Sequence, residues 1–430
     1  MKRTVLYWGI AWLCLSSCLP DAYACTGITL QTQQGNVVTA RTIEWAAEAL
    51  NSGYVVVPRG HKQQSFLPDG TQNGKRFTAK YGYVGLTVEQ PEFVMNGMNE
   101  AGLEAGLFYF PAYGQYETYD EALQAQTVSD FQLVAWILSN FKTIDELKAA
   151  MPLIHVVGID PRSSTVHWRV TEQTGRQVVI EITEGQVHFY ENALGVLTNA
   201  PGFEWHLTNL NNYINLSTGT IHTRRIGDLT LTAFGGGGGL HGIPGDMTPP
   251  SRFVRAAFFQ STAPKLATTG ETVSEAFHIL NNFDIPIGVQ FAEGQEIADI
   301  PSATQWTVAC DLQGRRIFYR TMYNATIRCI DLGKIDFRKV KYQTAPLDKE
   351  KKQPVEQVLI ANKTRAARQG GPCFIGNQRR DYSAVSSVSP ALSALKSAAG
   401  ALVAAGTAGC CIASAASCTW SLIRLASASP

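Results

Sequence analysis

The chain has 430 residues, of which 45% are hydrophobic, so it is long enough to bury one large core or two smaller ones. Its 36 Lys and Arg residues balance 35 Asp and Glu residues, and a net charge of +1 excludes the strongly basic surface that binds nucleic acids or anionic membranes. We therefore expect no nucleic-acid partner.

Residues 1–24 have the three parts of a secretory signal peptide. Lys2 and Arg3 form a cationic start, Val5–Leu19 is an apolar run, and Ala22-Tyr23-Ala24 fits the small-x-small rule for cleavage. The apolar run is shorter than the ~20 residues that span a bilayer, which argues against a membrane anchor. We expect signal peptidase to cleave after Ala24 and the protein to be exported, either to a bacterial periplasm or out of the cell.

A competing processing site lies inside the apolar run. Leu15-Ser16-Ser17-Cys18 resembles a lipoprotein cleavage box. Processing there would leave further residues ahead of Cys25, which would remain an internal residue of the chain.

Cleavage after Ala24 would make Cys25 the first residue of the mature protein. Only Cys25, Cys310 and Cys329 lie in the central body of the chain, and this odd number leaves at least one thiol free in an exported protein. An N-terminal Cys carries a nucleophilic thiol and a free α-amine, whose reference pKa of about 7.7 to 8.0 lets it act as a base near neutral pH. Cys25 is therefore the candidate catalytic nucleophile.

The segment after Cys25 alternates apolar and polar residues around a turn at Gln34-Gly35-Asn36, a pattern that predicts a β-hairpin ending at Trp45. Cys25 is expected to begin an inner strand. Further predicted strands are Tyr54–Pro58, Lys80–Leu86, Phe93–Met95, Ala105–Phe110, Ser164–Thr171, Gln177–Thr183 and Val187–Tyr190. Helical periodicity covers Ser129–Phe141, Thr143–Ala150, Pro250–Gln260 and Thr272–Asn281. Runs of strands with helices between them favour an α+β layered domain.

The composition changes from about Lys339 onward. Lys349-Glu350-Lys351-Lys352 is a charged stretch, and Pro390–Ala415 is dominated by Ala, Ser and Gly. This composition favours a poorly ordered tail over a membrane segment, because small residues contribute little transfer energy and Lys396 interrupts the run. The expected organisation is a leader at 1–24, a catalytic domain at 25–340 and a tail at 341–430.

Six strings in chain order resemble the choloylglycine hydrolase family, which contains bile salt hydrolases and penicillin V acylases. They are CTGITL, ARTIEW, MNEAGLEAGLFYFPAY, GVLTNAPGFEWHLTNLNNY, PGDMTPPSRFVRAAFF and FHILNNF. The resemblance runs from Cys25 to about Phe337. It implies an N-terminal-nucleophile hydrolase fold, an αββα four-layer sandwich of two stacked antiparallel sheets between helices, and a homotetramer.

The resemblance also assigns roles to residues. Cys25 matches the nucleophile, Arg41 an arginine beside the sulfur, Asn199 an oxyanion donor and Arg252 a second active-site arginine. Glu44 matches an aspartate that accepts from the α-amine, and so departs from the family by one methylene. Tyr109 stands where bile salt hydrolases carry Asn and penicillin V acylases carry Tyr, and its backbone N–H is expected to complete the oxyanion hole.

Aromatic residues surround this proposed site in the resemblance, namely Trp45, Phe108, Phe110 and Tyr113, and we expect them to bind substrate. We therefore expect hydrolysis of the N-acyl amide of a small amphipathic molecule through an acyl thioester, with penicillin V-like amides and N-acyl homoserine lactones ahead of conjugated bile salts. A non-catalytic exported binding protein on the same fold is the alternative. No cofactor is expected, and the eight histidines lack the paired spacing of a zinc site.

Overall fold

The alternating segment after the leader forms the predicted hairpin. In this computed structural model, which describes residues 23–159 and 165–360, β1 (Tyr23–Gln31) pairs antiparallel with β2 (Val37–Trp45). Cys25 lies opposite Ile43, and Gly27 lies opposite Arg41. The turn contains Gly35 at φ +82°, a left-handed conformation that glycine adopts without a steric penalty. Most of the expected leader and of the Ala/Ser/Gly-rich tail lies outside the described residues.

The hairpin belongs to a five-stranded antiparallel sheet with the order β1-β2-β16-β17-β18. The other strands are β16 (Thr304–Asp311), β17 (Arg316–Thr321) and β18 (Asn324–Asp331). The expectation that Cys25 begins an inner strand was wrong, because β1 is an edge strand of this sheet; on its outer side the described residues form one bridge, Gly27 with Leu197. The backbone of Cys25 is therefore open to partners from outside the sheet.

A second, eight-stranded antiparallel sheet has the order β13-β12-β11-β8-β7-β6-β3-β19. Its strands are β3 (Ser52–Val57), β6 (Tyr83–Val88), β7 (Gln90–Asn99), β8 (Glu104–Tyr109), β11 (Val166–Thr171), β12 (Gln177–Thr183), β13 (Gln186–Glu191) and β19 (Gln343–Pro346). β19 extends the folded domain past residue 340, because it pairs with β3 and supplies the last strand of this sheet.

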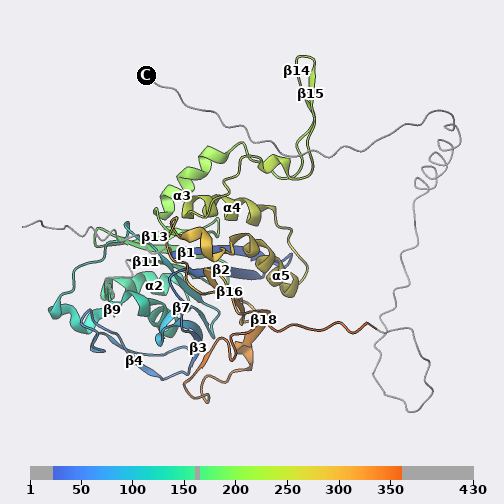
Figure 1. Cartoon of the computed structure of the whole chain (residues 1–430). Helices are drawn as coiled ribbons and strands as arrows, with labels where there is room; N and C mark the ends of the chain where they lie inside the picture. The colour runs from blue at the N-terminus through green and yellow to red at the C-terminus, as the bar shows by residue number, and fades with distance from the viewer. Residues whose placement is uncertain (1–22, 160–164, 361–430) are drawn as a thin grey trace, which may run out of the picture. The chain divides into compact units, whose positions relative to one another are not determined.

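Helices cover the outer faces of both sheets and produce the expected four-layer αββα sandwich (Figure 1). α4 (Pro249–Thr262) and α5 (Thr269–Leu280) pack on the five-stranded sheet, whereas α1 (Leu133–Asn140) packs on β7 and β8. The remaining predicted helix is α2 (Ile144–Ala150). α3 (Phe203–Asn209) and strands β16–β18 were not predicted from the sequence. None of the helices in the described part of the chain is long and apolar enough to cross a membrane.

Two buried arginines link the inner faces of the sheets. Arg41 on β2 donates to the carbonyls of Met95 and Leu107 in the other sheet. Arg169 on β11 donates to the carbonyl of Ile28 on β1 (3.3 Å) and pairs with Glu104 (3.3 Å). Each guanidinium carries five N–H donors, so one side chain can satisfy carbonyls and a carboxylate inside the core.

Candidate active site

The Cys25 thiol lies against a guanidinium at the start of β1. Cys25 Sγ is 2.9 Å from Arg41 Nη2, and the residue is 4% exposed. Burial is the largest influence and raises the pKa of the thiol above its usual value; the Glu44 charge also raises it, whereas the Arg41 charge and a backbone hydrogen bond from Tyr109 lower it. In this chain the nitrogen of Cys25 is still part of the Ala24–Cys25 peptide bond.

Arg41 is held in place by contacts on several sides. Its Nε donates to Thr42 O (3.1 Å), and its Nη1 reaches two carbonyls of the facing sheet. The Phe108 ring lies 4.1 Å from the guanidinium carbon. The orientation of the guanidinium toward the sulfur is therefore set by the protein interior, and cation–π contact adds to the hydrogen bonds.

Asn199 joins the Cys25 backbone to the eight-stranded sheet. Its Oδ1 accepts from the Cys25 nitrogen (2.8 Å), and its Nδ2 donates to Tyr109 O (2.7 Å). One N–H of the side-chain amide remains for a further acceptor. The bridge between Gly27 and Leu197 aligns the Asn199 segment with β1, which explains how a residue so distant in sequence reaches Cys25.

Arg252 contacts the same two residues from α4. Its guanidinium donates to Cys25 O (2.6 Å), Thr26 Oγ1 (2.7 Å) and Asn199 Oδ1 (2.7 Å), and its Nε donates to Met247 O (2.9 Å). Arg252 is fully buried. It therefore orients the Cys25 backbone and the Asn199 side chain together, and does not contact the sulfur through any of these bonds.

Glu44 lies on β2 directly opposite Ala24, the last residue of the expected leader. Burial raises the pKa of its carboxyl group to about 8, although the charges of Arg252 and Arg41 and a hydrogen bond from Thr42 oppose this shift. Its Oε1 accepts from Thr304 Oγ1 (3.4 Å). With Ala24 attached, the acceptor for the Cys25 nitrogen is Asn199 and not Glu44.

The predicted aromatic residues separate into two groups. Trp45 is partly buried and Tyr113 is half exposed, so both can be reached by a ligand. Phe108 and Phe110 have no exposed surface: Phe108 supports Arg41, and Phe110 stacks on His167 with ring centroids 4.4 Å apart. The alternation of β8 turns Phe108 into the space between the sheets, and in this conformation it cannot line an open pocket.

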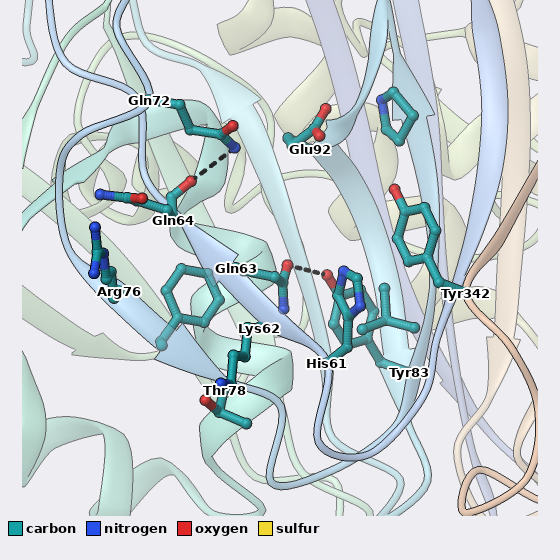
Figure 2. Close-up of a pocket in the computed structure, with 13 residues that line it drawn as sticks. His61, Lys62, Gln63, Gln64, Gln72, Arg76, Thr78, Tyr83, Glu92 and Tyr342 are labelled. Carbon is teal, nitrogen blue, oxygen red and sulfur yellow. Dashed lines mark hydrogen bonds between the residues drawn. The ribbon is translucent and has the colours of Figure 1, made fainter.

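A cavity of about 520 Å³ elsewhere in the domain contains none of the predicted site residues. Figure 2 shows its lining around β4 (Lys62–Gln64) and β5 (Arg76–Thr78), where Tyr83 donates to Gln63. His61 stacks on Tyr342, which precedes β19. Within residues 23–159 and 165–360, no group of three or more His, Cys, Asp or Glu side chains could hold a metal ion.

Two further residues lie at the site and were not predicted from the sequence. Thr26 accepts a hydrogen bond from Arg252, and His206 lies 2.8 Å from the carbonyl of Asn199. Thr26 follows Cys25 directly, so its position was the available signal. His206 is a single histidine on a short helix, and no local pattern distinguishes it from a core residue.

Comparison with known proteins identifies the family. Residues 25–345 match the family model for linear amide C–N hydrolases of the choloylglycine hydrolase family. A bile salt hydrolase/transferase of Clostridium perfringens is 33% identical over 318 residues, which cover 72% of this chain and 93% of that protein. A penicillin V acylase of Pectobacterium atrosepticum is 24% identical, covering 72% of this chain and 81% of that protein.

Solved structures agree with the fold. The crystal structure of a mutant conjugated bile acid hydrolase from Clostridium perfringens superposes with a TM-score of 0.66 at 30% identity and covers 78% of this chain and 99% of that one. A penicillin V acylase from Agrobacterium tumefaciens, 23% identical with a TM-score of 0.60, shares the fold over 74% of this chain and 90% of its own. The chain therefore belongs to the choloylglycine hydrolase family and is a hydrolase of linear amide C–N bonds.

Proposed function

We propose that the mature protein is an exported amidase whose nucleophile is Cys25. The observation that carries this proposal is the 2.9 Å contact between Cys25 Sγ and Arg41, in a residue whose nitrogen is 2.8 Å from Asn199 Oδ1. A cationic neighbour favours thiolate over thiol. Removal of the leader after Ala24 would turn the peptide nitrogen of Cys25 into a free α-amine at the same position.

The reaction divides into two steps. The α-amine takes the thiol proton as Cys25 Sγ attacks the amide carbon, and the oxyanion is held by an Asn199 Nδ2–H and by the Tyr109 N–H. The α-ammonium returns the proton to the leaving amine as the C–N bond breaks, which leaves an acyl thioester. Water then attacks the thioester, and the α-amine again relays the proton, releasing a carboxylic acid and free Cys25.

Export follows from the expected signal peptide, and a bacterial periplasm is the proposed location. Signal peptidase would act between Ala24 and Cys25. N-terminal sequencing or intact mass of the exported protein tests this step. A mature chain that begins at Cys18 would contradict the nucleophile assignment, because Cys25 would keep its peptide nitrogen.

The proposed substrate is the N-acyl amide of a small amphipathic molecule, with penicillin V-like amides and N-acyl homoserine lactones first. Tyr109 supports this choice because it is the residue type that penicillin V acylases carry at this position. The accessible rings of Trp45 and Tyr113 suit a flat or aliphatic acyl group. Conjugated bile salts are the second candidate, favoured by the similarity to proteins named bile salt hydrolase/transferase.

Substitution of the nucleophile tests the proposal against a non-catalytic binding protein. Cys25→Ser is expected to lower kcat by at least about 10³-fold, because an alcohol is far less acidic than a thiol, while thermal unfolding stays close to that of the wild type. Hydrolysis of penicillin V by the purified mature proteins provides the measurement. Cys329→Ser, at an exposed thiol outside the site, is the matched control and should keep full activity. Undiminished turnover in Cys25→Ser would end the hypothesis.

Substrate choice is tested by a side-by-side assay with penicillin V, a long-chain N-acyl homoserine lactone and glycocholate. The ratio of kcat/KM for either of the first two over glycocholate should exceed one, and Tyr109→Asn should lower it about twofold to tenfold, since such ring contacts contribute about 0.5 to 1.5 kcal/mol. If glycocholate is the best of the three substrates, the bile salt assignment replaces the one proposed.

A further inference from the structure

His206 is a buried side chain that the reaction described above does not use. It lies on α3 with no exposed surface, and its ring stacks on Phe253, with centroids 4.6 Å apart and an interplanar angle of 8°. Its Nε2 is 2.8 Å from the carbonyl oxygen of Asn199. Phe253 follows Arg252 on α4, so the ring packs next to the arginine that holds the Asn199 side chain.

The partners of His206 determine which ring nitrogen carries the proton. A carbonyl oxygen only accepts hydrogen bonds, so Nε2 must be the donor. The other nitrogen, Nδ1, is buried and has no hydrogen-bond partner among the described residues. Burial lowers the pKa of His206 to about 4, so the ring is neutral at physiological pH.

This arrangement is costly for a residue that only fills space. Burial of a ring nitrogen without a hydrogen-bond partner is unfavourable relative to burial of a paired one. An apolar side chain of similar size would fill the same space without burying Nδ1. What histidine adds at this position is the Nε2–H bond to Asn199.

Asn199 is held by hydrogen bonds at its backbone carbonyl, where His206 Nε2–H donates, and at its side chain. The carbonyl is held by His206, the side-chain Oδ1 by Arg252 (2.7 Å) and the Cys25 nitrogen (2.8 Å), and Nδ2 donates to Tyr109 O (2.7 Å). The preceding carbonyl, Thr198 O, lies 3.2 Å from Nε2 of a second buried histidine, His167. The peptide that carries the side-chain amide is therefore bound on both successive carbonyls.

We propose that His206 is a positioning residue for amide hydrolysis: its Nε2–H holds the Asn199 carbonyl and thereby keeps the Asn199 side chain directed at the Cys25 nitrogen and the oxyanion. This inference rests on the proposed function, since it needs Asn199 to act on the Cys25 reaction. A displaced oxyanion donor raises the barrier to attack without changing contacts to the rest of the substrate.

The test compares His206→Gln with His206→Met in the mature protein. The two side chains have similar length and volume, but only Gln carries an N–H donor, so a folding defect common to both variants cancels. We expect Met to lower kcat about 10- to 100-fold with KM within about twofold of the wild type, and Gln to recover most of that loss. Turnover is expressed per thiol titrated at Cys25, so that inactive protein is not counted.

His188→Phe is the matched control, because His188 stacks on Tyr190 of β13 and its side chain makes no hydrogen bond to a site residue in the described part of the chain; it should retain the wild-type kcat. A purely structural role predicts lower unfolding temperatures with unchanged turnover per titrated site, and that result in His206→Met would overturn the proposal. Equal losses of kcat in the Gln and Met variants would also overturn it. Failure of the proposed function is distinguishable, because it appears as hydrolysis by Cys25→Ser, independently of His206.

Discussion

Cys25 is subject to opposing influences on the acidity of its thiol. Burial raises its pKa, and Arg41 and the Tyr109 backbone lower it. Ala24, the last residue of the expected leader, packs in a small apolar cluster with Ala46, Ile285 and Ala303, apart from the cluster that contains Cys25. Removal of Ala24 would create an α-amine on Cys25, whose protonated form adds a positive charge beside the sulfur, and would leave the Arg41 contact in place. We therefore expect the thiol to become more acidic on maturation.

Glu44→Gln is expected to flatten the pH dependence of stability in a chain that retains Tyr23 and Ala24. Burial raises the pKa of Glu44 from 4.5 to about 8, so between these values the folded state keeps a proton that the unfolded state releases. The free energy of unfolding contributed by Glu44 thus falls as pH rises through this range, by up to about 1.4 kcal/mol per pH unit.

Urea unfolding of the wild type and the variant between about pH 5 and about pH 8 measures this difference. Glu48→Gln, at an exposed carboxylate a few residues further along the chain, is the control and should keep the wild-type slope. A Glu44→Gln protein that loses stability with pH as steeply as the wild type would contradict the expectation.

At the scale of elements, α4 and β1 form the site by their packing. α4 begins with Pro249 and Pro250, whose missing N–H groups cost nothing in the first turn of a helix. The helix packs on β1, and this contact brings Arg252 to the carbonyl of Cys25. Because β1 is an edge strand, its outer backbone groups form hydrogen bonds with Asn199 and Arg252 instead of pairing with a further strand.

Gly27→Ala should destabilise the domain where β1 faces Phe108 and Arg169 of the eight-stranded sheet. A Cβ at Gly27 would lie 2.6 Å from Arg169 Nη1 and 2.9 Å from the Phe108 ring, so both side chains would have to move. Overpacking of this kind costs about 1 to 3 kcal/mol. Because Phe108 supports Arg41, we also expect kcat to fall.

Urea unfolding and turnover measured on the same preparation test this change. Gly270→Ala is the matched control: it lies in α5, where an added methyl group would have nothing within 4 Å, and it should be neutral or stabilising by up to about 1 kcal/mol. Wild-type stability and activity in Gly27→Ala would show that the sheets tolerate the extra methyl group.

At the scale of the molecule, one hairpin exposes apolar side chains that the domain does not cover. β14 (Arg224–Ile226) and β15 (Leu229–Leu231) project from the domain in Figure 1. Ile226 is 58% exposed and Leu229 is 62% exposed, and the Phe234 ring is also exposed. An isolated two-stranded hairpin is marginally stable in water, so packing of these side chains against another surface would stabilise it.

Leu229→Asp is expected to reduce assembly of the homotetramer that the family resemblance implies. A buried, unpaired carboxylate at an apolar interface is strongly unfavourable, so the molar mass should fall toward that of a monomer. Light scattering during size-exclusion chromatography measures it. Leu153→Asp, at an equally exposed leucine after α2, should leave the mass unchanged. A wild-type protein that is already monomeric would contradict this prediction.

The sequence by itself determined the fold family, most strands of the eight-stranded sheet, four helices and the candidate nucleophile. These features depend on local patterns: alternation, helical periodicity, residues that fit a cleavage rule and family strings in order. β16–β18 were not predicted; β16, TQWTVACD, is the central strand of its sheet and is buried along its whole length, so its sequence lacks a sustained alternation of apolar and polar residues.

Only the tertiary structure decided how the site is assembled. Asn199 and Arg252 reach Cys25 from 174 and 227 residues away, because an edge strand leaves its backbone open to a bridging segment and to α4. Phe108 and Phe110 were expected to bind substrate. Both lie buried instead, because the Phe108 ring packs against the Arg41 guanidinium and the Phe110 ring stacks on His167. Burial by elements distant in sequence also raises the pKa of Glu44, and the packing of α3 brings His206 to the Asn199 carbonyl. No local sequence pattern predicts either feature.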